Sequence, residues 1–337
     1  MTARIGFACK WIDTPDECAG RKPTSESRDL NGRSTTMRWL REHKSEAEQR
    51  QWDIMNHNAR AALLMVERVG SLPAHLRMVR LGSEMLQGYT EKDWQVWWQR
   101  QEIQDHCAKI FAPIGARARE LGVRLSFHPG QFCVLASESN EIAERSIEEF
   151  EYHADMARWM GYGKKFQDFK INVHISGRKG PAGIQSALKR LSPEARNCIT
   201  IENDEMTWGI DASLELARDC ALVLDIHHHW IKTGEYIEAN DDRIKRVIDS
   251  WRGVRPVIHY SVSREDVLVG HSRLQLPALV PLMESGHKKG KLRAHSDFFW
   301  NDAVNAWAIT HGSWSDIMCE SKGKNLASQD FYCRATA

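Results

Sequence analysis

Short apolar runs of β-branched and aliphatic residues alternate with longer amphipathic segments along this chain. The longer segments have helical spacing, most clearly over Glu141–Met160 and Asp211–Asp219. Strands and helices that alternate in this way predict an α/β fold of the TIM barrel type, in a single domain. The expected strands are Arg4–Ala8, Met78–Leu81, Val123–Phe127, Phe169–Val173, Cys198–Ile201, Cys220–Leu224, Val257–Ile258 and Asp316–Cys319.

Side chains that can bind a metal ion directly follow most of these runs. Because the carboxyl ends of parallel strands meet at one rim when a barrel closes, these side chains are expected to converge. Imidazoles and carboxylates gathered in this way predict one polynuclear metal centre. The candidate ligands are His128, His174, Glu202, Asp225, His259 and Glu320, with His228 three residues after Asp225.

The acidic cluster from Glu202 to Glu205 has two interpretations. Asn203, Asp204 and Glu205 could decorate a helix N-terminus, where carboxylates complement the helix dipole, or could take part in the site. Glu202 closes its apolar run and is expected to face the barrel mouth. An unpaired carboxylate would be unfavourable there, and a metal ion would compensate it.

Asp225 is followed by three histidines in a row, His227, His228 and His229. Successive side chains on an extended segment point to opposite sides, so the three cannot all serve one site. We assign His228 to the metal centre, and expect His227 and His229 to support it or to be exposed. His295 lies in a less regular stretch and is a weaker candidate.

The length and composition of the chain bear on its domain count, its compartment and its affinity for nucleic acid. A chain of 337 residues is long enough for one complete barrel. No apolar run is long enough for a membrane span, and no apolar signal core is seen, so we expect a cytoplasmic protein, close to the nucleoid in a prokaryote. Eight cysteines without a Cys-x-x-Cys pair predict reduced thiols. With 46 basic and 45 acidic residues, nucleic-acid binding would depend on local patches.

Some segments are expected to lie outside the barrel framework. Thr14–Asn31 is predicted to be a loop, and Ser34–Thr36 to cap the helix that follows it. Leu274–Met283 has helix-like spacing. The residues after Leu326 are predicted to be a frayed tail, which gives a barrel domain over residues 1–326 and a tail over 327–337.

Motifs spread over nearly the whole chain, from Gly6 to about Leu326, resemble those of the UV damage endonuclease family. The resemblance implies a TIM barrel that nicks damaged double-stranded DNA immediately 5′ to pyrimidine dimers, 6-4 photoproducts and abasic sites. It implies attack by a metal-activated hydroxide that leaves a 3′-hydroxyl and a 5′-phosphate, without a membrane or an obligate protein partner. The motifs are His128-Pro-Gly-Gln-Phe, Val173-His174-Ile-Ser-Gly, Ile201-Glu202-Asn-Asp-Glu, Asp225-x-x-His228-His229, His259-Tyr-Ser and Glu320-Ser-Lys-Gly-Lys.

The resemblance also implies how the ligands are divided among three metal ions. A bridging carboxylate would hold the first two ions about 4 Å apart around the scissile phosphate, so the paired ions would carry catalysis. Manganese is the usual metal of the family, and mixed imidazole and carboxylate ligands also suit zinc. The implied ligands are His128, His174 and Glu202 for the first ion, Glu202, Asp225, His259 and Glu320 for the second, and His228 and His295 for the third.

One departure from the family pattern concerns the third ion. The family usually has a lysine, carboxylated to act as a ligand, two residues before the seventh-strand histidine, where this chain has Val257. Valine cannot bind a metal. We therefore expect two tight sites, and a third that would need Asp297, water or phosphate as its anion.

Further positions are implied to contact DNA. Gln131 and Phe132 occupy the place of a glutamine-tyrosine wedge that enters the duplex at the lesion. Phe7 stands where the family often has tyrosine, and Glu84 where some members have histidine. A run of charges over Lys288–Arg293 could contact phosphates or simply be solvated. The other expected phosphate contacts are Arg178, Lys179, Lys322 and Lys324.

Two other classes of function stay open from the sequence. A sugar isomerase or epimerase of the xylose-isomerase type also gathers Glu, Asp and His at strand ends. It predicts a closed polyol pocket, whereas the Phe132 wedge and the rim lysines favour an open groove. A non-catalytic damage-binding protein is motivated only by Val257, and the complete ligand set for paired metals argues against it.

Overall fold

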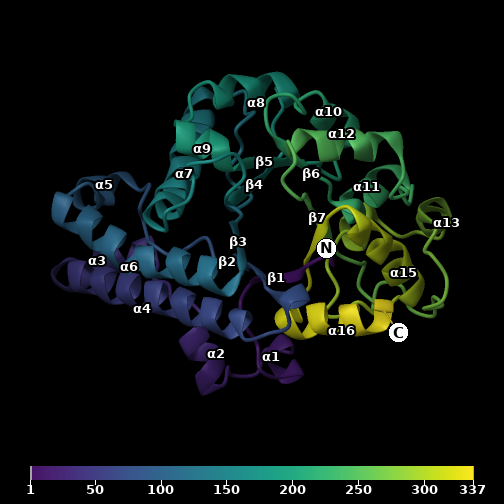
Figure 1. Ribbon diagram of the computed structural model, residues 1–337, viewed down its shortest axis with the longest axis horizontal. Helices are drawn as coiled ribbons and strands as arrows, with labels where there is room; N and C mark the ends of the chain where they lie inside the picture. Colours follow the sequence, from purple (N-terminus) through teal and green to yellow (C-terminus); the bar gives the residue numbers. More distant parts are fainter. Residues whose placement is uncertain (1, 337) are drawn as a thin grey trace.

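The computed structural model describes residues 2–336 and shows eight parallel strands in a ring that is surrounded by helices (Figure 1). Hydrogen bonds join the strands in the order β6-β5-β4-β3-β2-β1-β8-β7. Between β6 and β7 the ring is closed by a bridge that pairs Asp225 with His259, where the His259 amide donates to the Leu224 carbonyl at 3.0 Å. The predicted single-domain TIM barrel is thereby confirmed.

Every expected strand is present, with ends that differ from the predicted ends by at most two residues. The strands are β1 Ile5–Cys9, β2 Met78–Leu81, β3 Arg124–Phe127, β4 Lys170–His174, β5 Ile199–Glu202, β6 Ala221–Val223, β7 Val257–Tyr260 and β8 Asp316–Cys319.

The helices form the outer layer, and the two longest, α4 and α6, pack on each other. Their bounds are α1 Pro15–Cys18, α2 Ser25–Leu30, α3 Met37–Glu42, α4 Lys44–Gly70, α5 Lys92–Trp98, α6 Gln101–Leu121, α7 Asn140–Trp159, α8 Gly180–Leu188, α9 Pro193–Cys198, α10 Ile210–Leu214, α11 Ile226–Thr233, α12 Asp242–Ser250, α13 Leu279–Glu284, α14 Lys289–Leu292, α15 Asp302–Thr310 and α16 Lys324–Thr336.

Alternation along the strands decides which side chains enter the barrel. On β4, Ile171 and Val173 pack in the apolar core between strands and helices, and Lys170 and Asn172 take the other face. These inward polar groups lie beneath the carboxyl rim. A second, smaller apolar cluster fills the interior below them, with Ala8, Met78, Ala221, Val223, Val257, Met318 and Trp251. The barrel therefore has an apolar floor and a polar mouth.

Two segments differ from the predicted loop and tail. The region Thr14–Asn31 contains the short helices α1 and α2 because Leu30 is buried and the Thr24 side chain caps α2. The chain after Leu326 continues as helix α16, against β1, and Phe331 is fully buried. An apolar side chain that packs on the barrel thus orders the segment expected to fray.

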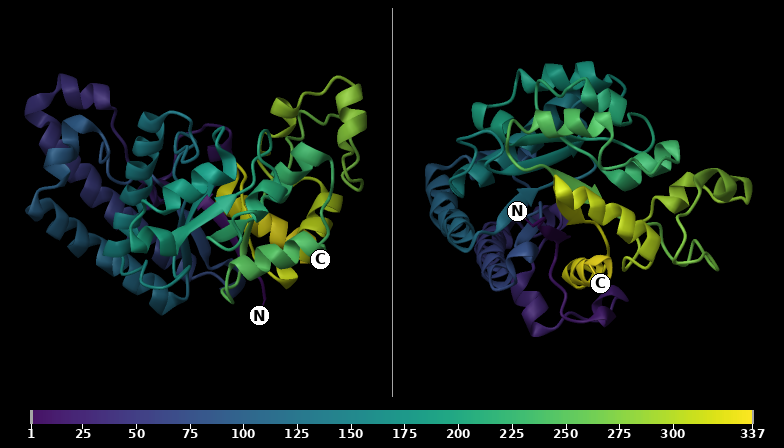
Figure 2. Two further views of the ribbon diagram at one scale, coloured as in Figure 1. Left: turned by 90° about the horizontal axis from the view of Figure 1, so that it is seen from above. Right: turned by 45° about the vertical axis from the view of Figure 1, so that its right-hand side comes forward.

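Thr36 caps α3 as predicted, because its hydroxyl accepts a hydrogen bond from the Trp39 amide. The helix expected over Leu274–Met283 is shorter and begins only after Pro277, where proline disfavours helix before it. The segment with α13 extends away from the body of the barrel (Figure 2). None of the helices in the described part of the chain combines the length and apolar character needed to cross a bilayer.

Candidate metal centre

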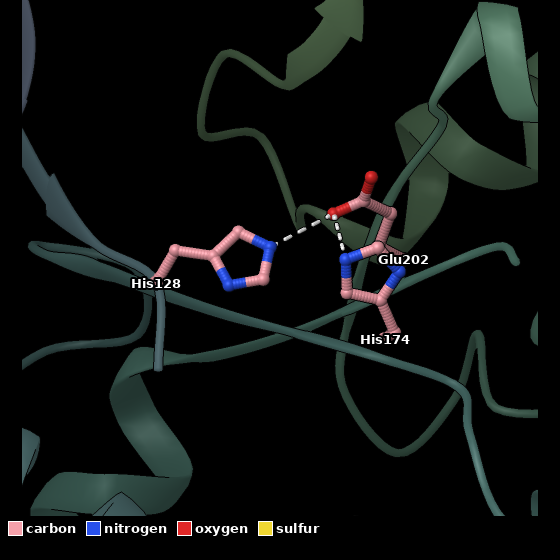
Figure 3. Close-up of side chains that lie close together, drawn as sticks. All are labelled: His128, His174 and Glu202. Carbon is pink, nitrogen blue, oxygen red and sulfur yellow. Dashed lines mark ion pairs between the residues drawn. The ribbon is translucent and has the colours of Figure 1, made fainter. Parts of the chain in front are cut away.

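Glu202, at the end of β5, is the hub of the candidate centre. Its side chain is fully buried, and its Oε2 atom lies 3.4 Å from Nε2 of His128 and 3.9 Å from Nε2 of His174 (Figure 3). The same oxygen is 3.0 Å from Nδ1 of His259, and Oε1 is 3.5 Å from Nδ1 of His228. The carboxylate therefore presents its two oxygens to imidazoles from four different barrel elements.

The seven ligands predicted from the strand ends fall into three overlapping groups. In each group, one ligand atom per residue lies within 4.8 Å of the others. The groups are His128, His174 and Glu202; Glu202, Asp225 and His228; and Asp225, His259 and Glu320. Glu202 and Asp225 each belong to two groups, which is the arrangement expected for carboxylates shared between neighbouring cations.

Three ligand atoms in the cluster have charged neighbours but lack a hydrogen-bond partner among the described residues. Glu202 Oε1, Asp225 Oδ2 and His259 Nδ1 are buried and accept or donate no hydrogen bond there. A buried polar atom without a partner is destabilising. Bound cations would satisfy all three atoms, so the residues fit a divalent metal centre of mixed nitrogen and oxygen ligands.

Burial and the charges of neighbouring side chains shift the pKa of several members of the cluster. Burial raises the pKa of Glu202, but the imidazoles of His259, His174 and His128 outweigh it and hold the pKa well below its ordinary value. Burial, reinforced by the carboxylates of Glu202 and Glu320, raises the pKa of Asp225 well above its ordinary value. Neighbouring carboxylates thus oppose the ionisation of Asp225, and a cation between them would relieve the repulsion.

The pKa values of His259 and His228 shift in opposite directions. Burial lowers the pKa of His259 to about 4, which leaves its ring neutral, the form that binds metals. Burial also opposes the charge of His228, but the carboxylates of Asp225, Glu202 and Glu205 raise its pKa to about 9. His228 therefore carries a positive charge in the metal-free centre at neutral pH.

The histidine triplet lies at the start of helix α11, not on the extended segment that the sequence suggested. The Asp225 side chain caps this helix by accepting a hydrogen bond from the His228 amide at 2.7 Å. Successive side chains then point about 100° apart around the helix. His228 faces the centre, His229 contacts Glu235 at 2.9 Å, and His227 stacks on Trp230 away from it. Of the three histidines, His228 alone belongs to a group of candidate ligands in the described residues, and the geometry that separates the three is helical.

Several residues of the centre were not recognised in the sequence. Asn172 donates to Glu202 Oε2 and accepts from Thr200, and Lys170 Nζ lies 2.8 Å from His259 Nε2. Arg80, on β2, forms an ion pair with Glu320. Each is a polar residue inside an apolar strand at an inward position, and that is the signal by which the sequence could have revealed them.

The sequence leaves Glu205 open between a helix terminus and a role in the site. Its Oε2 atom lies 3.8 Å from His228 Nε2, and its Oε1 accepts from Arg293 at 2.6 Å. The Asn203 side chain donates a hydrogen bond to the Asp225 backbone carbonyl and accepts one from the Asp225 backbone amide. These two residues support His228 and Asp225 and do not cap a long helix.

Ligands for a third ion are less complete in the described residues. His295 Nδ1 is 4.0 Å from Glu320 Oε2, and His295 belongs to none of the three groups. Val257 packs in the apolar floor of the barrel. Asp297 pairs with Lys322 at 3.2 Å. Glu205 is the carboxylate that approaches the outer nitrogen of His228.

A family model for UV-endonuclease UvdE matches residues 4–331. The chain belongs to the UvdE family.

Relatives of this UvdE-family chain include proteins from bacteria and a fungus. The UV DNA damage endonuclease of Bacillus velezensis is 30% identical over 167 residues, which cover 46% of this chain and 50% of that protein. The UV DNA damage endonuclease of Bacillus mycoides is 25% identical over 254 residues, 70% of this chain and 71% of that protein. The match covers 30% of the UV-damage endonuclease of Neurospora crassa, so the chain spans half or less of some relatives.

Solved structures share the fold of the UvdE-family chain. The crystal structure of SacUVDE superposes with a TM-score of 0.71 at 22% identity, over 99% of this chain and 96% of that one. Endonuclease IV from Thermus thermophilus superposes with a TM-score of 0.51 at 14% identity, over 82% of this chain and 94% of that one. At these identities the likeness shows the barrel architecture alone.

Around the UvdE-family centre, a cavity of about 570 Å³ opens between the loops after β3, β4 and β5 and the residues near α14. Gln131 lies in its wall, and Phe132 beside it is 84% exposed, an unusual position for a phenylalanine. Gly177 has a φ of +95°, and a side chain there would collide with the Ala136 backbone. This glycine lets the loops after β3 and β4 pack closely against each other.

The remaining candidates for DNA contact include one buried residue, Phe7, and several residues near the surface. Phe7 is only 2% exposed and packs edge-on against Trp11 in the core, so its side chain cannot reach DNA. The prediction for Phe7 is corrected because its β1 position faces the helices and not the barrel mouth. Arg178, Lys179 and Lys322 are exposed, and Arg178 forms an ion pair with Glu138. Lys324 is half-buried at the start of α16.

Proposed function

We propose that this UvdE-family chain is a metal-dependent DNA repair endonuclease. It nicks the damaged strand immediately 5′ to UV photoproducts and abasic sites, and its substrate is damaged double-stranded DNA in the cytoplasm. The observation that carries the proposal is the convergence of Glu202, Asp225 and His259 at the barrel mouth. Each keeps a buried ligand atom that has no hydrogen-bond partner among the described residues. The names of the relatives support DNA damage as the target.

The paired centre would be held by two of the groups that the structure brings together. His128, His174 and Glu202 would hold one cation, and Asp225, His259 and Glu320, together with Glu202, would hold the other. Manganese fits these ligands, and zinc is the alternative. When bound, the cations would neutralise the scissile phosphate and favour ionisation of an attacking water.

The protein's own residues orient this chemistry. Asn172 donates to one oxygen of Glu202, which fixes the carboxylate plane between His128 and His259. Asp225 is held by the Asn203 amide hydrogen bonds and by the His228 amide. Ligands that are fixed in this way before binding reduce the reorganisation required during reaction.

Recognition of the lesion would depend on the exposed rim. Phe132 offers an aromatic face that can stack in a duplex from which a damaged dinucleotide is turned out, and Gln131 lies beside it. Arg178, Lys179, Lys322 and Lys324 would contact phosphates, because the first three lie in loops that follow ligand-bearing strand ends and Lys324 begins α16 just after Glu320.

A duplex with one defined cyclobutane dimer and an end label tests the proposal. Incubation with protein and manganese is expected to give one product cut immediately 5′ to the dimer, with a 3′-hydroxyl that a polymerase extends. Chelation of the metal, or an undamaged duplex, is expected to give no product. Binding of the damaged duplex without any cleavage would overturn the endonuclease and favour a damage-binding protein.

Two variants test whether cleavage depends on the metal ligands when the fold is retained. Glu202→Gln and Glu320→Gln each remove an anionic ligand but keep the side-chain volume, so cleavage should be lost while the circular dichroism spectrum is retained. Near-normal nicking by both variants would contradict the assignment of the centre.

A further inference from the structure

Arg80 places a positive charge inside the candidate metal centre. It lies at the inward position of β2 above Met78, and its guanidinium pairs with the Glu320 carboxylate. The side chains are 12% and 11% exposed. A ligand that would hold a divalent cation is thus already occupied by a cation of the protein.

An arginine differs from the other cationic groups at this site. Histidine can lose its proton when a metal ion binds, but a guanidinium stays protonated in proteins. Arg80 would repel a divalent cation, and the repulsion would be strong because the site is partly buried and its dielectric constant is low. Removal of Arg80 would relieve this repulsion. We expect this gain to exceed the loss of one hydrogen bond that orients Glu320.

We propose that Arg80 is a fixed countercharge of the metal centre. In the metal-free protein it holds the Glu320 carboxylate in place. In the metal-bound protein it weakens cation binding. It also adds positive charge that attracts the negatively charged scissile phosphate. Arg80 is in this sense a positioning residue for Glu320 and an electrostatic one for the substrate. The proposal rests on the metal-dependent function proposed above.

The test measures metal affinity and cleavage separately. Manganese binding to the metal-free wild type and to Arg80→Gln is measured by calorimetry in the absence of DNA, and nicking of the dimer duplex is measured with saturating manganese. We expect Arg80→Gln to bind manganese about tenfold more tightly. We expect its cleavage rate constant to fall about 100-fold, the size typical of removing one group that stabilises developing negative charge.

Controls separate charge from damage to the fold. Arg80→Lys keeps a cation and should bind manganese like the wild type, with cleavage partly restored. Arg60→Gln, on the exposed face of α4, should change neither quantity. If Arg80→Gln does not fold, as judged by thermal unfolding in chelator, Arg80→Met retains the aliphatic stem and takes its place.

The outcomes distinguish this proposal from the proposed function. A folded Arg80→Gln that binds manganese as weakly as the wild type or more weakly, beside a wild type that nicks normally, overturns the role of Arg80 alone. A wild type that binds manganese but does not nick the damaged duplex overturns the endonuclease, whereas a changed affinity in Arg80→Gln still supports the countercharge. A wild type that does not bind manganese overturns both.

Discussion

The amine Nζ of Lys170 lies 2.8 Å from Nε2 of His259, and both side chains are buried. This contact turns the opposite ring nitrogen, Nδ1, toward Glu202 at 3.0 Å and Glu320 at 3.3 Å. Lys170 and His259 come from β4 and β7, on different sides of the barrel. The ligand geometry of one strand is thus set by a side chain from another.

Lys170→Met is expected to weaken manganese binding about tenfold, as is usual when the outer partner of a metal-binding histidine is removed. The melting temperature should not fall, because methionine keeps the volume and removes a buried amine. Calorimetry and thermal unfolding measure the two effects. Lys170→Gln retains a hydrogen-bonding group and should lie closer to the wild type. Unchanged affinity in the methionine variant would show that His259 is oriented by other contacts.

Phe132→Ala is expected to reduce discrimination between damaged and undamaged duplex more than it slows cleavage at an abasic site. Stacking by an aromatic side chain contributes about 1–3 kcal/mol per base, and an abasic site is already partly unstacked. Because Phe132 is 84% exposed, its removal should leave the fold unchanged. Nicking rates on dimer, abasic and undamaged duplexes are compared. An equal loss on every substrate would argue against a wedge.

Metal analysis of the purified protein is expected to give two tightly bound ions and a third bound weakly or not at all. Val257 lies in the apolar floor and Asp297 is engaged by Lys322, so His228 and His295 lack the anion that the family lysine would supply. Asp297→Asn should therefore leave the stoichiometry unchanged. Three tightly held ions would show this expectation to be wrong.

Glu205 and Val257 allow the third position to be probed further. If a weak third ion is detected, Glu205→Gln should remove it, because Glu205 approaches the outer nitrogen of His228 at 3.8 Å. Val257→Lys restores the family residue and should raise third-ion occupancy if the amine becomes carboxylated. The same change buries a long polar chain in the floor, so a lower melting temperature is expected.

Glu149 on α7 predicts a pH dependence of stability away from the centre. Burial, with the charge of Glu84, raises its pKa from 4.5 to about 7 despite a hydrogen bond from Thr90. A raised carboxyl pKa contributes stability that is complete below about pH 4.5 and is lost as the pH rises through 7.

Glu149→Gln should therefore unfold at a higher urea concentration than the wild type at pH 8, and at a similar concentration at pH 4.5. Glu148→Gln changes an exposed neighbour and is the matched control. A constant difference between Glu149→Gln and the wild type at both pH values would contradict the shifted pKa.

The strands and the principal ligands could be predicted because both depend on local patterns. Each apolar run followed by His, Asp or Glu places that side chain at a strand end, and closure of a parallel barrel brings all such ends to one rim. This is why His128 lies beside Glu202, and Glu320 beside Asp225, although they are far apart in the chain.

Other features were decided by tertiary structure because local patterns do not specify them. The strand β1 is apolar on both faces, so the sequence did not show that Phe7 faces the helices while Ala8 enters the barrel. The histidine triplet became helical through the Asp225 cap. The tail was ordered by the burial of Phe331.

By itself, the sequence determined the barrel and the set of side chains at its mouth, because strand periodicity and chain order are local properties. Only the tertiary structure decided which buried partners these side chains find. Arg80 with Glu320, and Lys170 with His259, are separated by 240 and 89 residues. Such pairs form only when the closed ring brings inward-facing groups from non-adjacent strands within hydrogen-bonding distance, where burial makes each unpaired polar group unfavourable.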